Sequence, residues 1–478
     1  MWRTKPIDLS APIAGIWKLS NTPDEYPGIL VLEGERLLLK LFIKVDMDRS
    51  ILPIDEVEHI KKLTETRAPY IHGHTKTAGH VTLFDCYYVD YQSLNSLDPA
   101  IARVQLTFTP IQAWHGDSFL YTKQRTNKLR FSIPNLHSIL ANIQVRHRHE
   151  EPRETFTVLR SDPPPAKIKT EYGDYHISFR TNISESHSRI AGIKIETTNL
   201  VFVEGPESSI SNLLKISDEI TQFLSFLCIG RVIGESHTIT ISPNKEAKLL
   251  WIFGRRDDLQ QSERTSHHSI ALFAEFPERI NEALLLWFNS SPEQKLARFL
   301  MADTLPQDKF SISKFLAAAQ AWEIIGRASK NNSGYDKDEF RDACKEASGI
   351  FQRRFGTEAS NRIYALISSS NRKSFSDLIK DSLNNISPKI VAAVVGDADK
   401  FVSAIVKTRN VLTHMEGKKN YTLDEASAAC ILLTYKLTVL FCIHECVHIK
   451  LPLDNLSSAL ANNPIARWAR SDLSAINY

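Results

Sequence analysis

Apolar positions in the first 250 or so residues mostly alternate with polar ones or form short runs bounded by turn residues, which is the pattern of β-strands. Residues 102–108 show the alternation that a half-buried strand requires. Gly34 lies at the junction of two apolar runs and predicts a hairpin turn. The predicted strands are 29–36, 37–43, 80–89, 102–108, 175–179, 193–197, 238–241 and 249–253.

Helical periodicity replaces this pattern after about residue 270. One earlier segment, 208–230, has the same periodicity and ends at Gly230. The helices predicted beyond it are 277–289, 293–302, 312–328, 338–355, 359–369, 373–382, 388–395, 398–415 and 422–449. Pro452 and Pro464 interrupt the pattern in the C-terminal tail.

This change of periodicity predicts an α+β protein with a β-rich N-terminal region followed by an all-α helical bundle. The polar run 254–269 is a candidate linker or exposed loop between the two. We therefore expect one domain over residues 1–270 and another over residues 271–478. A chain of 478 residues is too long for a single ordinary core, which agrees with at least two domains.

Composition indicates a soluble globular protein and limits how it can contact nucleic acid. The chain is 42% hydrophobic and 24% charged, with a net charge of +3. A balance so close to neutral excludes bulk attraction to a polyanion, so any nucleic-acid contact must be a local patch.

Cysteine usage and the apolar segments predict a cytoplasmic location. The six cysteines are scattered through mostly apolar runs, which indicates reduced, buried thiols rather than a disulfide framework. The first six residues carry charge but no signal-peptide apolar region follows them. The apolar stretch 426–443 has Lys436 near its middle, so we expect a buried core helix and no membrane span.

The strongest candidate for chemistry is the segment 409–414, with the sequence Arg-Asn-Val-Leu-Thr-His. It lies on a predicted helix whose other face is apolar. Arginine is a permanent, forked cation suited to a phosphate. Histidine has the proton equilibrium nearest neutral pH. Phosphodiester cleavage by an internal hydroxyl needs little more than such a pair.

The spacing of this pair restricts how Arg409 and His414 could act together. On a straight α-helix they would lie about 140° apart and about 7.5 Å along the axis. They converge only if the helix ends or bends between them, or if a second copy of the chain supplies the partner. Gly417, followed by polar residues, is a plausible helix stop. The alternative from spacing alone is a solvated Arg409 and a His414 that complements the helix C-terminus.

These residues resemble the HEPN superfamily, helical-bundle proteins marked by an Arg, four to six residues and a His. Here the spacing is the shorter one, with the polar Asn410 after Arg409. The segment 314–327 looks like the early HEPN helix that carries a recurrent acidic residue, which would be Glu323.

More narrowly, the chain is similar to ApeA-like anti-phage proteins. Their N-terminal region typically opens with a Gly-x-Trp element and a Pro-Gly-x-Leu element, found here at residues 15–17 and 27–30. Residues 71–73 and 81–83 also look like that region. The elements occur in the expected order, so the resemblance covers most of the chain.

The resemblance implies a metal-independent endoribonuclease of bacterial abortive infection that needs no cofactor. His414 would be the general base on a ribose 2′-hydroxyl or the general acid at the leaving oxygen. Arg409 would stabilise the charge growing on the phosphate. Asn410 would orient the site or hold the backbone of the bend, and Glu323 would pair with Arg409 and set its direction. The products would carry a 2′,3′-cyclic phosphate and a 5′-hydroxyl.

The resemblance also implies partners. The substrate would be RNA, with tRNA as one candidate, and the chain would form a homodimer or higher homo-oligomer. The architecture alone predicts a division of labour: a toxic nuclease must be held inactive until infection, so the β-rich region would sense a phage-derived trigger or restrain the nuclease. The alternative from another class is a catalytically inactive HEPN module used for dimerisation or RNA binding.

Other motifs suggest competing chemistry. Residues 444–448 match His-Glu-x-x-His, a zinc-protease motif in which His444 and His448 share a helix face and Glu445 is the base. No third ligand follows at a recognisable spacing, so this alternative is weak.

Three further features carry less weight. His72, His74 and His80, and the pair at 147 and 149, lack a fourth ligand at fixed spacing, so we expect surface histidines and no metal. The basic stretches 123–130 and 146–153 are equally consistent with an RNA-backbone contact and an ordinary solvated face. No phosphate-binding loop of the Walker type is present, which argues against an ATPase.

Overall fold

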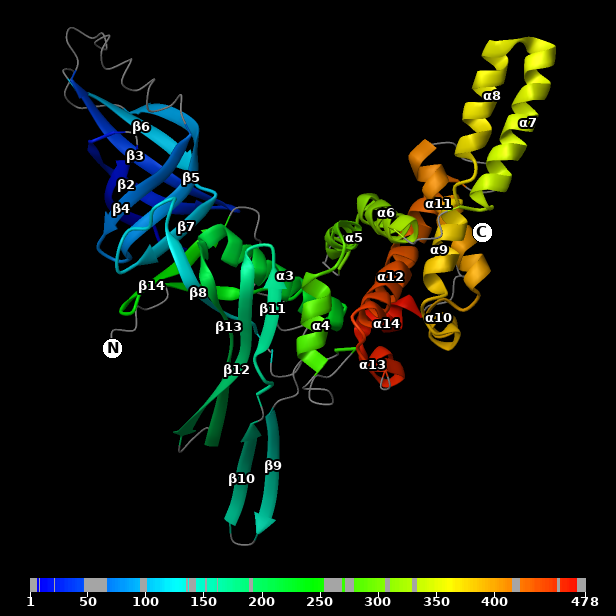
Figure 1. Ribbon diagram of the computed structural model, residues 1–478. Coiled ribbons are helices and arrows are strands. Elements are labelled where there is room, and N and C mark those ends of the chain that lie inside the picture. Colours follow the sequence, from blue (N-terminus) through cyan, green and yellow to red (C-terminus); the bar gives the residue numbers. More distant parts are fainter. Residues whose placement is uncertain are drawn as a thin grey trace. The chain divides into compact units, whose positions relative to one another are not determined.

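The computed structural model describes residues 7, 9–20, 22–46, 67–94, 101–134, 136, 143–150, 153–160, 162–188, 192–252, 269–270, 279–305, 310–328, 333–414, 422–453 and 456–470. They form two compact units that interleave along the chain (Figure 1). The first comprises residues 1–134, 170–218 and 234–262, and the second 135–169, 219–233 and 263–478. The predicted linker 254–269 lies almost entirely outside the described residues, and the functional boundary near 270 stays a prediction.

Six strands of the first unit close into an antiparallel ring. Their bounds are β1 (Ile13–Leu19), β2 (Glu25–Glu33), β3 (Arg36–Asp46), β4 (Ala68–Thr75), β5 (Gly79–Leu94) and β6 (Ile101–Thr109). The first half of β5 pairs with β4, and its second half pairs with β6. The remaining pairings run from β6 through β3, β2 and β1 back to β4, which leaves no open edge in the ring.

Trp17 lies at the centre of this ring and explains the glycines around it. On β1 it pairs with Gly73 of β4, while Gly15 pairs with Gly28 of β2. A Cβ atom on Gly73 would lie 2.4 Å from the Trp17 ring, and one on Gly28 would lie 2.9 Å from it. Only glycine leaves room for the indole. Three of the four N-terminal segments that the sequence singled out, 15–17, 27–30 and 71–73, therefore meet around one buried side chain.

A second run of strands extends from the other side of β5. It follows the order β7 (Gln112–Gly116), β15 (Lys245–Ile252), β14 (Glu235–Ser242), β8 (Arg125–Ser132), β13 (Gly192–Ser209) and β12 (Gly173–Ser188). Ser217, in the first part of helix α3 (Ile210–Cys228), lies 2.7 Å from the imidazole of His237 on β14. That imidazole stacks on Phe131 of β8, with ring centres 5.1 Å apart, so α3 is fixed to this sheet.

The second unit carries the remaining strands, β9 (Ile143–Glu150), β10 (Arg153–Arg160) and β11 (Ala166–Thr170), and a bundle of helices. The helices are α4 (Arg279–Phe288), α5 (Pro292–Ala302), α6 (Ile312–Ala328), α7 (Lys337–Phe355), α8 (Thr357–Ser369), α9 (Phe375–Leu383), α10 (Pro388–Val395), α11 (Ala398–His414), α12 (Leu423–His448), α13 (Leu456–Asn462) and α14 (Pro464–Ala469). Every helix predicted beyond residue 270 is present, with ends shifted by at most two residues. The short helices α13 and α14 were not predicted. The second half of α3 also belongs to this unit, where Phe226 packs against Trp287 of α4 and Phe441 of α12.

Helix α12 is the core of the bundle. It is long and apolar enough to cross a membrane, but 72% of its most apolar window is buried inside the protein. Lys436 is buried too, and its ammonium donates a 2.9 Å hydrogen bond to the carbonyl of Val394 in the last turn of α10. The buried lysine is therefore satisfied by a helix C-terminus, as in the core helix of a soluble protein.

The six cysteines are free and buried. Burial raises the pKa of both Cys228 and Cys430 to about 12. These thiols stay protonated at neutral pH and fill apolar space.

Candidate active site

The candidate motif occupies the last two turns of α11, and the burial of that helix sets the direction of each side chain. Phe401, Val402 and Ile405 are buried and attach α11 to the bundle. Arg409 follows Ile405 by four positions and lies on the same face. Its side chain is 34% exposed, so the stem packs while the guanidinium reaches the surface.

The guanidinium of Arg409 is fixed by residues of two other helices. Its Nη2 donates a 3.0 Å hydrogen bond to Oε2 of Glu323 on α6. Its Cζ lies 4.6 Å from the centre of the Phe375 ring at the start of α9. The bond to Glu323 occupies one of the five N–H donors of the guanidinium. Among the described residues no second hydrogen bond from Arg409 is found, which leaves donors for an anionic ligand.

Glu323 connects two arginines. Its Oε1 accepts hydrogen bonds of 3.1 and 2.7 Å from Nε and Nη2 of Arg327, one turn further along α6. A single carboxylate thus faces two guanidinium groups, and the cluster keeps one net positive charge. A phosphate is the kind of group that this surplus favours.

Close contact between α6 and α9 makes this cluster possible. A Cβ atom on Gly326 would lie 2.6 Å from Cβ of Leu378, so only glycine permits the observed approach of the two helices. Ser374 and Asp377 form a capping box that starts α9. Phe375 is therefore the first residue of the helix and lies against Arg409.

His414 is the last residue of α11, so the helix runs without interruption from Arg409 to His414. Helical phase then separates the two positions by about 140°. Asn410 is exposed, and the Thr413 hydroxyl donates a 2.7 Å hydrogen bond to the carbonyl of Arg409. The side chain of His414 and the predicted stop at Gly417 lie outside the described residues. The helix therefore does not end between the two motif residues.

Comparison with known families identifies both parts of the chain. Residues 12–287 match ApeA N-terminal domain 1, and this match alone covers more than half of the 478 residues. The chain belongs to the ApeA-like family. Residues 316–447 match the Apea-like HEPN domain. The matched segment includes Glu323, Arg409 and His414. No curated protein and no solved structure matches this ApeA-like chain. The resemblance read from the sequence is confirmed, as is a β-rich N-terminal region followed by a helical HEPN domain.

The His-Glu-x-x-His segment of this ApeA-like chain is part of the HEPN core. Glu445 is 1% exposed, and its Oε2 accepts a 2.6 Å bond from Nε of Arg298, a residue with no exposed side-chain area. Gln294 donates to the other carboxylate oxygen. Burial has the largest single effect and raises the pKa of Glu445, but the Arg298 guanidinium and His444 together outweigh it and hold the pKa below its ordinary value.

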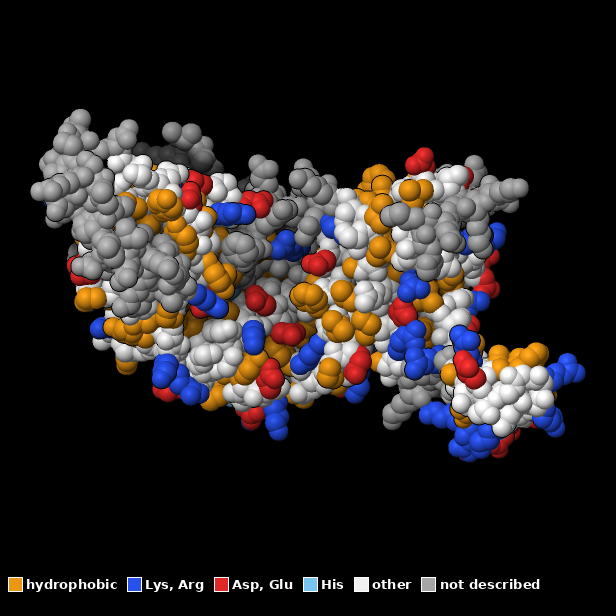
Figure 2. Space-filling model, turned by 90° about the horizontal axis from the view of Figure 1, so that it is seen from above, with side chains coloured by type: hydrophobic (Ala, Val, Ile, Leu, Met, Phe, Trp, Pro, Cys, Tyr) orange, Lys and Arg blue, Asp and Glu red, His pale blue; other side chains and the backbone are white. Residues whose placement is uncertain are grey.

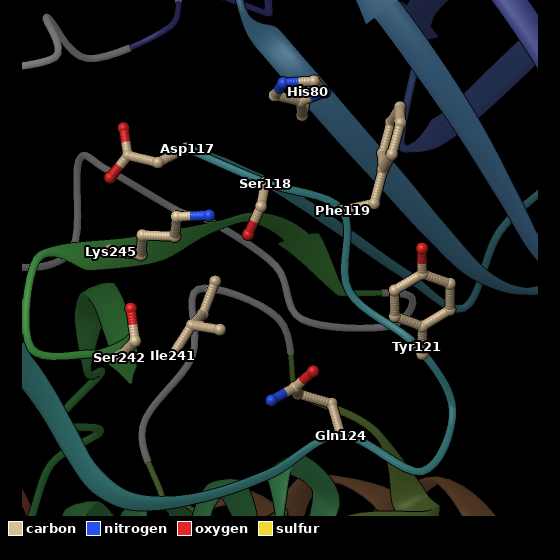
Figure 3. Close-up of a pocket in the computed structure, with 9 residues that line it drawn as sticks. All are labelled: His80, Asp117, Ser118, Phe119, Tyr121, Gln124, Ile241, Ser242 and Lys245. Atoms are coloured by element: carbon tan, nitrogen blue, oxygen red, sulfur yellow. The ribbon is translucent and has the colours of Figure 1, made fainter.

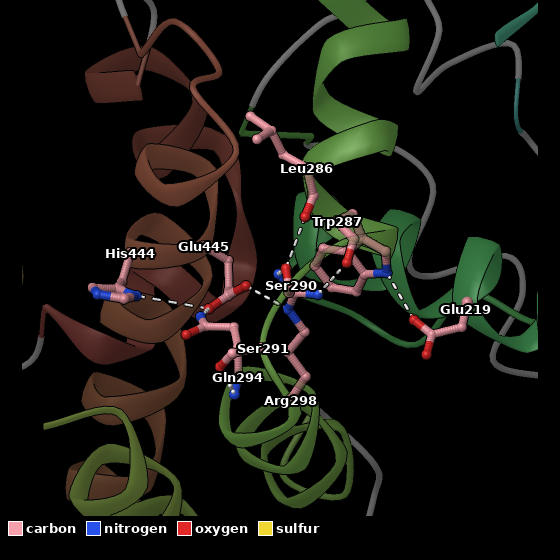
Figure 4. A network of polar contacts seen from close by, with 9 residues as sticks. All are labelled: Glu219, Leu286, Trp287, Ser290, Ser291, Gln294, Arg298, His444 and Glu445. Carbon is pink, nitrogen blue, oxygen red and sulfur yellow. Dashed lines mark hydrogen bonds and ion pairs between the residues drawn. The ribbon is translucent and has the colours of Figure 1, made fainter. Parts of the chain in front are cut away.

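Each of the three nitrogens of the Arg298 guanidinium has a hydrogen-bond acceptor (Figure 4). Its two terminal nitrogens donate to the carbonyl of Trp287 at 2.9 Å and to the hydroxyl of Ser290 at 2.8 Å. Its Cζ lies 3.6 Å from the centre of the Trp287 ring. Glu445 is therefore half of a buried ion pair that joins α12 to α5, and it is not placed to activate a zinc-bound water.

The three histidines near residue 75 do not form a metal site. His72 and His74 lie on β4 and His80 on β5, where all three surround the ring of Phe119. Within the described part of the chain no group of three His, Cys, Asp or Glu side chains is placed to hold a metal. His147 and His149 lie on β9, but their side chains are outside the described residues.

Two of the four basic side chains in the stretch 123–130 are paired with carboxylates. Lys128 pairs with Glu204 at 3.3 Å, and Arg130 pairs with Glu246 at 3.3 Å. Arg125 donates to a backbone carbonyl. On the face drawn in Figure 2, Lys and Arg side chains are interspersed with Asp and Glu. These pairings favour the ordinary solvated face over an RNA-backbone contact at this stretch.

Sequence reasoning missed Phe375. The Ser-x-x-Asp signature at 374–377 could have located the start of α9. No local signal could have placed its first residue against Arg409.

Proposed function

We propose that this ApeA-like protein is a HEPN endoribonuclease that acts in anti-phage defence and cleaves RNA by attack of a ribose 2′-hydroxyl. The observation that carries the proposal is the Arg409 guanidinium, held by Glu323 and Phe375 at the start of the Arg-x4-His motif within the HEPN region. The family assignment supports the role in defence, and the net positive cluster supports a phosphodiester as the reacting group.

In the proposed step His414 removes the proton of the 2′-hydroxyl, and the 2′-oxygen attacks the adjacent phosphorus. The bond from phosphorus to the 5′-oxygen breaks, and that oxygen takes up a proton from an imidazolium. The fragments carry a 2′,3′-cyclic phosphate and a 5′-hydroxyl. Arg409 stabilises the charge on the phosphate oxygens, so the chemistry needs no metal ion. Asn410, exposed beside Arg409, orients the substrate.

The uninterrupted helix suggests that Arg409 of one chain acts with His414 of a second chain. In a homodimer with two such sites, mixing an Arg409→Ala chain with a His414→Ala chain creates one site with both residues intact. Each mixed dimer then has one of its two sites intact, and random exchange makes about half of the dimers mixed, so we expect the mixture to recover about a quarter of the wild-type activity. No recovery, with dimer exchange confirmed, would assign both residues to one chain.

The direct test incubates the purified chain with total RNA and with defined tRNA in the presence of a chelator. Fragments that disappear in the His414→Ala variant support the proposal. An inactive HEPN module that binds RNA would shift the RNA in a gel without producing fragments from either protein, and that result would overturn the proposal. Trigger dependence is tested by repeating the assay in lysate from phage-infected cells.

A further inference from the structure

The β-rich unit contains a cavity of about 500 Å³ that the proposed nuclease site does not use (Figure 3). Its lining includes His80, Asp117, Phe119, Tyr121, Gln124 and Lys245. All the lining residues belong to the first unit. A volume of this size is within the range of about 300–1,000 Å³ that small-molecule sites occupy.

The aromatic wall of the cavity is held rigidly before any ligand arrives. Leu120 is anchored to the ring of strands on both sides of its backbone. Its N–H donates to the Thr82 hydroxyl at 3.0 Å, and its carbonyl accepts from Nε2 of His72 at 2.8 Å. Burial lowers the pKa of His72, so this imidazole is neutral at pH 7. The anchor fixes the two aromatic neighbours of Leu120, which are Phe119 and Tyr121.

Both rings then pack against histidines and still face the cavity. The Phe119 ring stacks on His72 with centres 4.3 Å apart and an angle of 11° between planes. Tyr121 meets His72 edge-on at 5.1 Å and remains 53% exposed. An exposed aromatic ring held at the mouth of a cavity is a stacking surface for a planar ligand.

The opposite side of the cavity is charged. Figure 3 shows Asp117 and Lys245 at one side, with Tyr121 and Gln124 at the other. The Asp117 carboxylate is oriented by a 3.1 Å hydrogen bond from the backbone N–H of Glu246. Lys245 supplies a positive charge, and His80 adds none, because burial and then the nearby His74 and Lys245 lower its pKa.

We propose that this cavity binds a ribonucleoside phosphate. The base stacks on the exposed ring of Tyr121, and the Gln124 amide reads its edge. The Asp117 carboxylate accepts hydrogen bonds from the ribose hydroxyls, and Lys245 pairs with the phosphate. The ligand is either a free mononucleotide or the terminal nucleotide of an RNA strand. A free mononucleotide contains no internal phosphodiester bond, so its binding can be measured without the proposed cleavage chemistry.

Calorimetric titration of the full chain with the four ribonucleoside 5′-monophosphates tests the proposal. We expect saturable binding of at least one of them at one site per chain. Tyr121→Ala should weaken it about tenfold and Lys245→Gln by a similar factor. Both side chains are exposed, so neither change empties the core. The matched controls are Tyr91→Ala and Lys76→Gln, exposed residues of the same unit outside the cavity, and they should leave affinity unchanged.

Three further arms make the test decisive. The matching deoxynucleotide should bind several-fold more weakly, and Asp117→Asn should remove that difference. Raising the salt concentration should weaken the wild type more than Lys245→Gln. A last titration distinguishes a free mononucleotide from the end of an RNA strand as the natural ligand. Short RNA strands with a terminal phosphate are titrated into the His414→Ala variant, which prevents cleavage. Tighter binding of these strands than of the mononucleotide would identify the strand end as the ligand. No saturable binding of any of these ligands, or wild-type affinity in either the Tyr121→Ala or the Lys245→Gln variant, would overturn the proposal.

Discussion

Glu323 and Arg409 are 86 positions apart in the sequence, and Oε2 of the first lies 3.0 Å from Nη2 of the second. The contact joins α6 to the last turns of α11. The contact occupies Nη2 of the Arg409 guanidinium, and the other guanidinium nitrogens take no part in this bond. The same carboxylate also holds Arg327, so the direction of Arg409 depends on a three-residue cluster at the surface of the HEPN domain.

Arg409→Lys tests whether the forked cation matters beyond its charge. Lysine keeps the positive charge but cannot donate from a planar fork. We expect kcat for RNA cleavage to fall by about 10²–10³ in Arg409→Lys and by at least as much in Arg409→Ala. The control is Arg341→Ala, an exposed arginine paired with Asp338 on α7, which should retain full activity. Near wild-type kcat in Arg409→Lys would show that a point charge is enough.

Glu323→Gln separates a positioning role from a purely structural one. The amide keeps the shape of the side chain but leaves Arg327 and Arg409 without their shared counter-charge. We expect kcat to fall about tenfold or more while KM changes little, because a displaced guanidinium loses its effect in the transition state. The free energy of unfolding should change by about 1 kcal/mol or less, as for other partly exposed ion pairs. Unchanged kcat would mean that Glu323 does not set the direction of Arg409.

Gly326→Ala tests the close contact between α6 and α9. The new methyl group would lie 2.6 Å from Cβ of Leu378, so α9 must move away and take Phe375 from Arg409. We expect a loss of about 1–3 kcal/mol in unfolding free energy, together with reduced cleavage. The matched control is Gly349→Ala in α7, where nothing lies within 4 Å of the added Cβ. That change should stabilise the protein by about 0.5–1 kcal/mol. Equal effects of the two substitutions in denaturant unfolding would contradict the packing argument.

Much of this architecture is readable from local sequence, and the reason is visible in particular residues. The long helices have clear signals: Thr422 and Glu425 cap α12, and Ser374 and Asp377 cap α9. The helices α13 and α14 have only seven and six residues, too few for periodicity to be recognised.

Contacts between distant segments could not be predicted from patterns. The ring of strands closes through the β1–β4 and β3–β6 pairings, which leave no local trace in the sequence. The contact of the Phe375 ring with Arg409 also joins segments that are distant in the sequence, so no local pattern predicts it. Helical phase alone does not say which neighbour a surface glutamate contacts. The family resemblance, and not the helical pattern, therefore pointed to Glu323 as the partner of Arg409.

Glu445→Gln tests the buried ion pair and the zinc-protease alternative together. The substitution leaves Arg298 buried without a counter-charge, and we expect a loss of about 3–5 kcal/mol in unfolding free energy at pH 7. Glu282→Gln, which breaks an exposed pair with Lys450, should cost less than about 1 kcal/mol. A zinc protease would instead lose proteolysis while keeping its stability.

The same ion pair has a predicted pH dependence. Burial acts to raise the folded-state pKa of Glu445, but Arg298 and His444 together hold it below the ordinary value of 4.5. The stabilisation is therefore complete above that value and is lost as pH falls through the lower folded-state pKa. Urea unfolding between pH 7 and pH 3 should show the wild type and Glu445→Gln converging below about pH 4.5. A constant difference down to pH 3 would contradict the assignment.

The most direct test of the central claim is the chemistry of the new 3′-end when the purified chain cleaves a defined RNA in chelator. Mass spectrometry of the fragments should find a 2′,3′-cyclic phosphate opposite a 5′-hydroxyl, with no fragments from the His414→Ala variant. A 3′-hydroxyl opposite a 5′-phosphate, or full activity in the variant, would contradict the account.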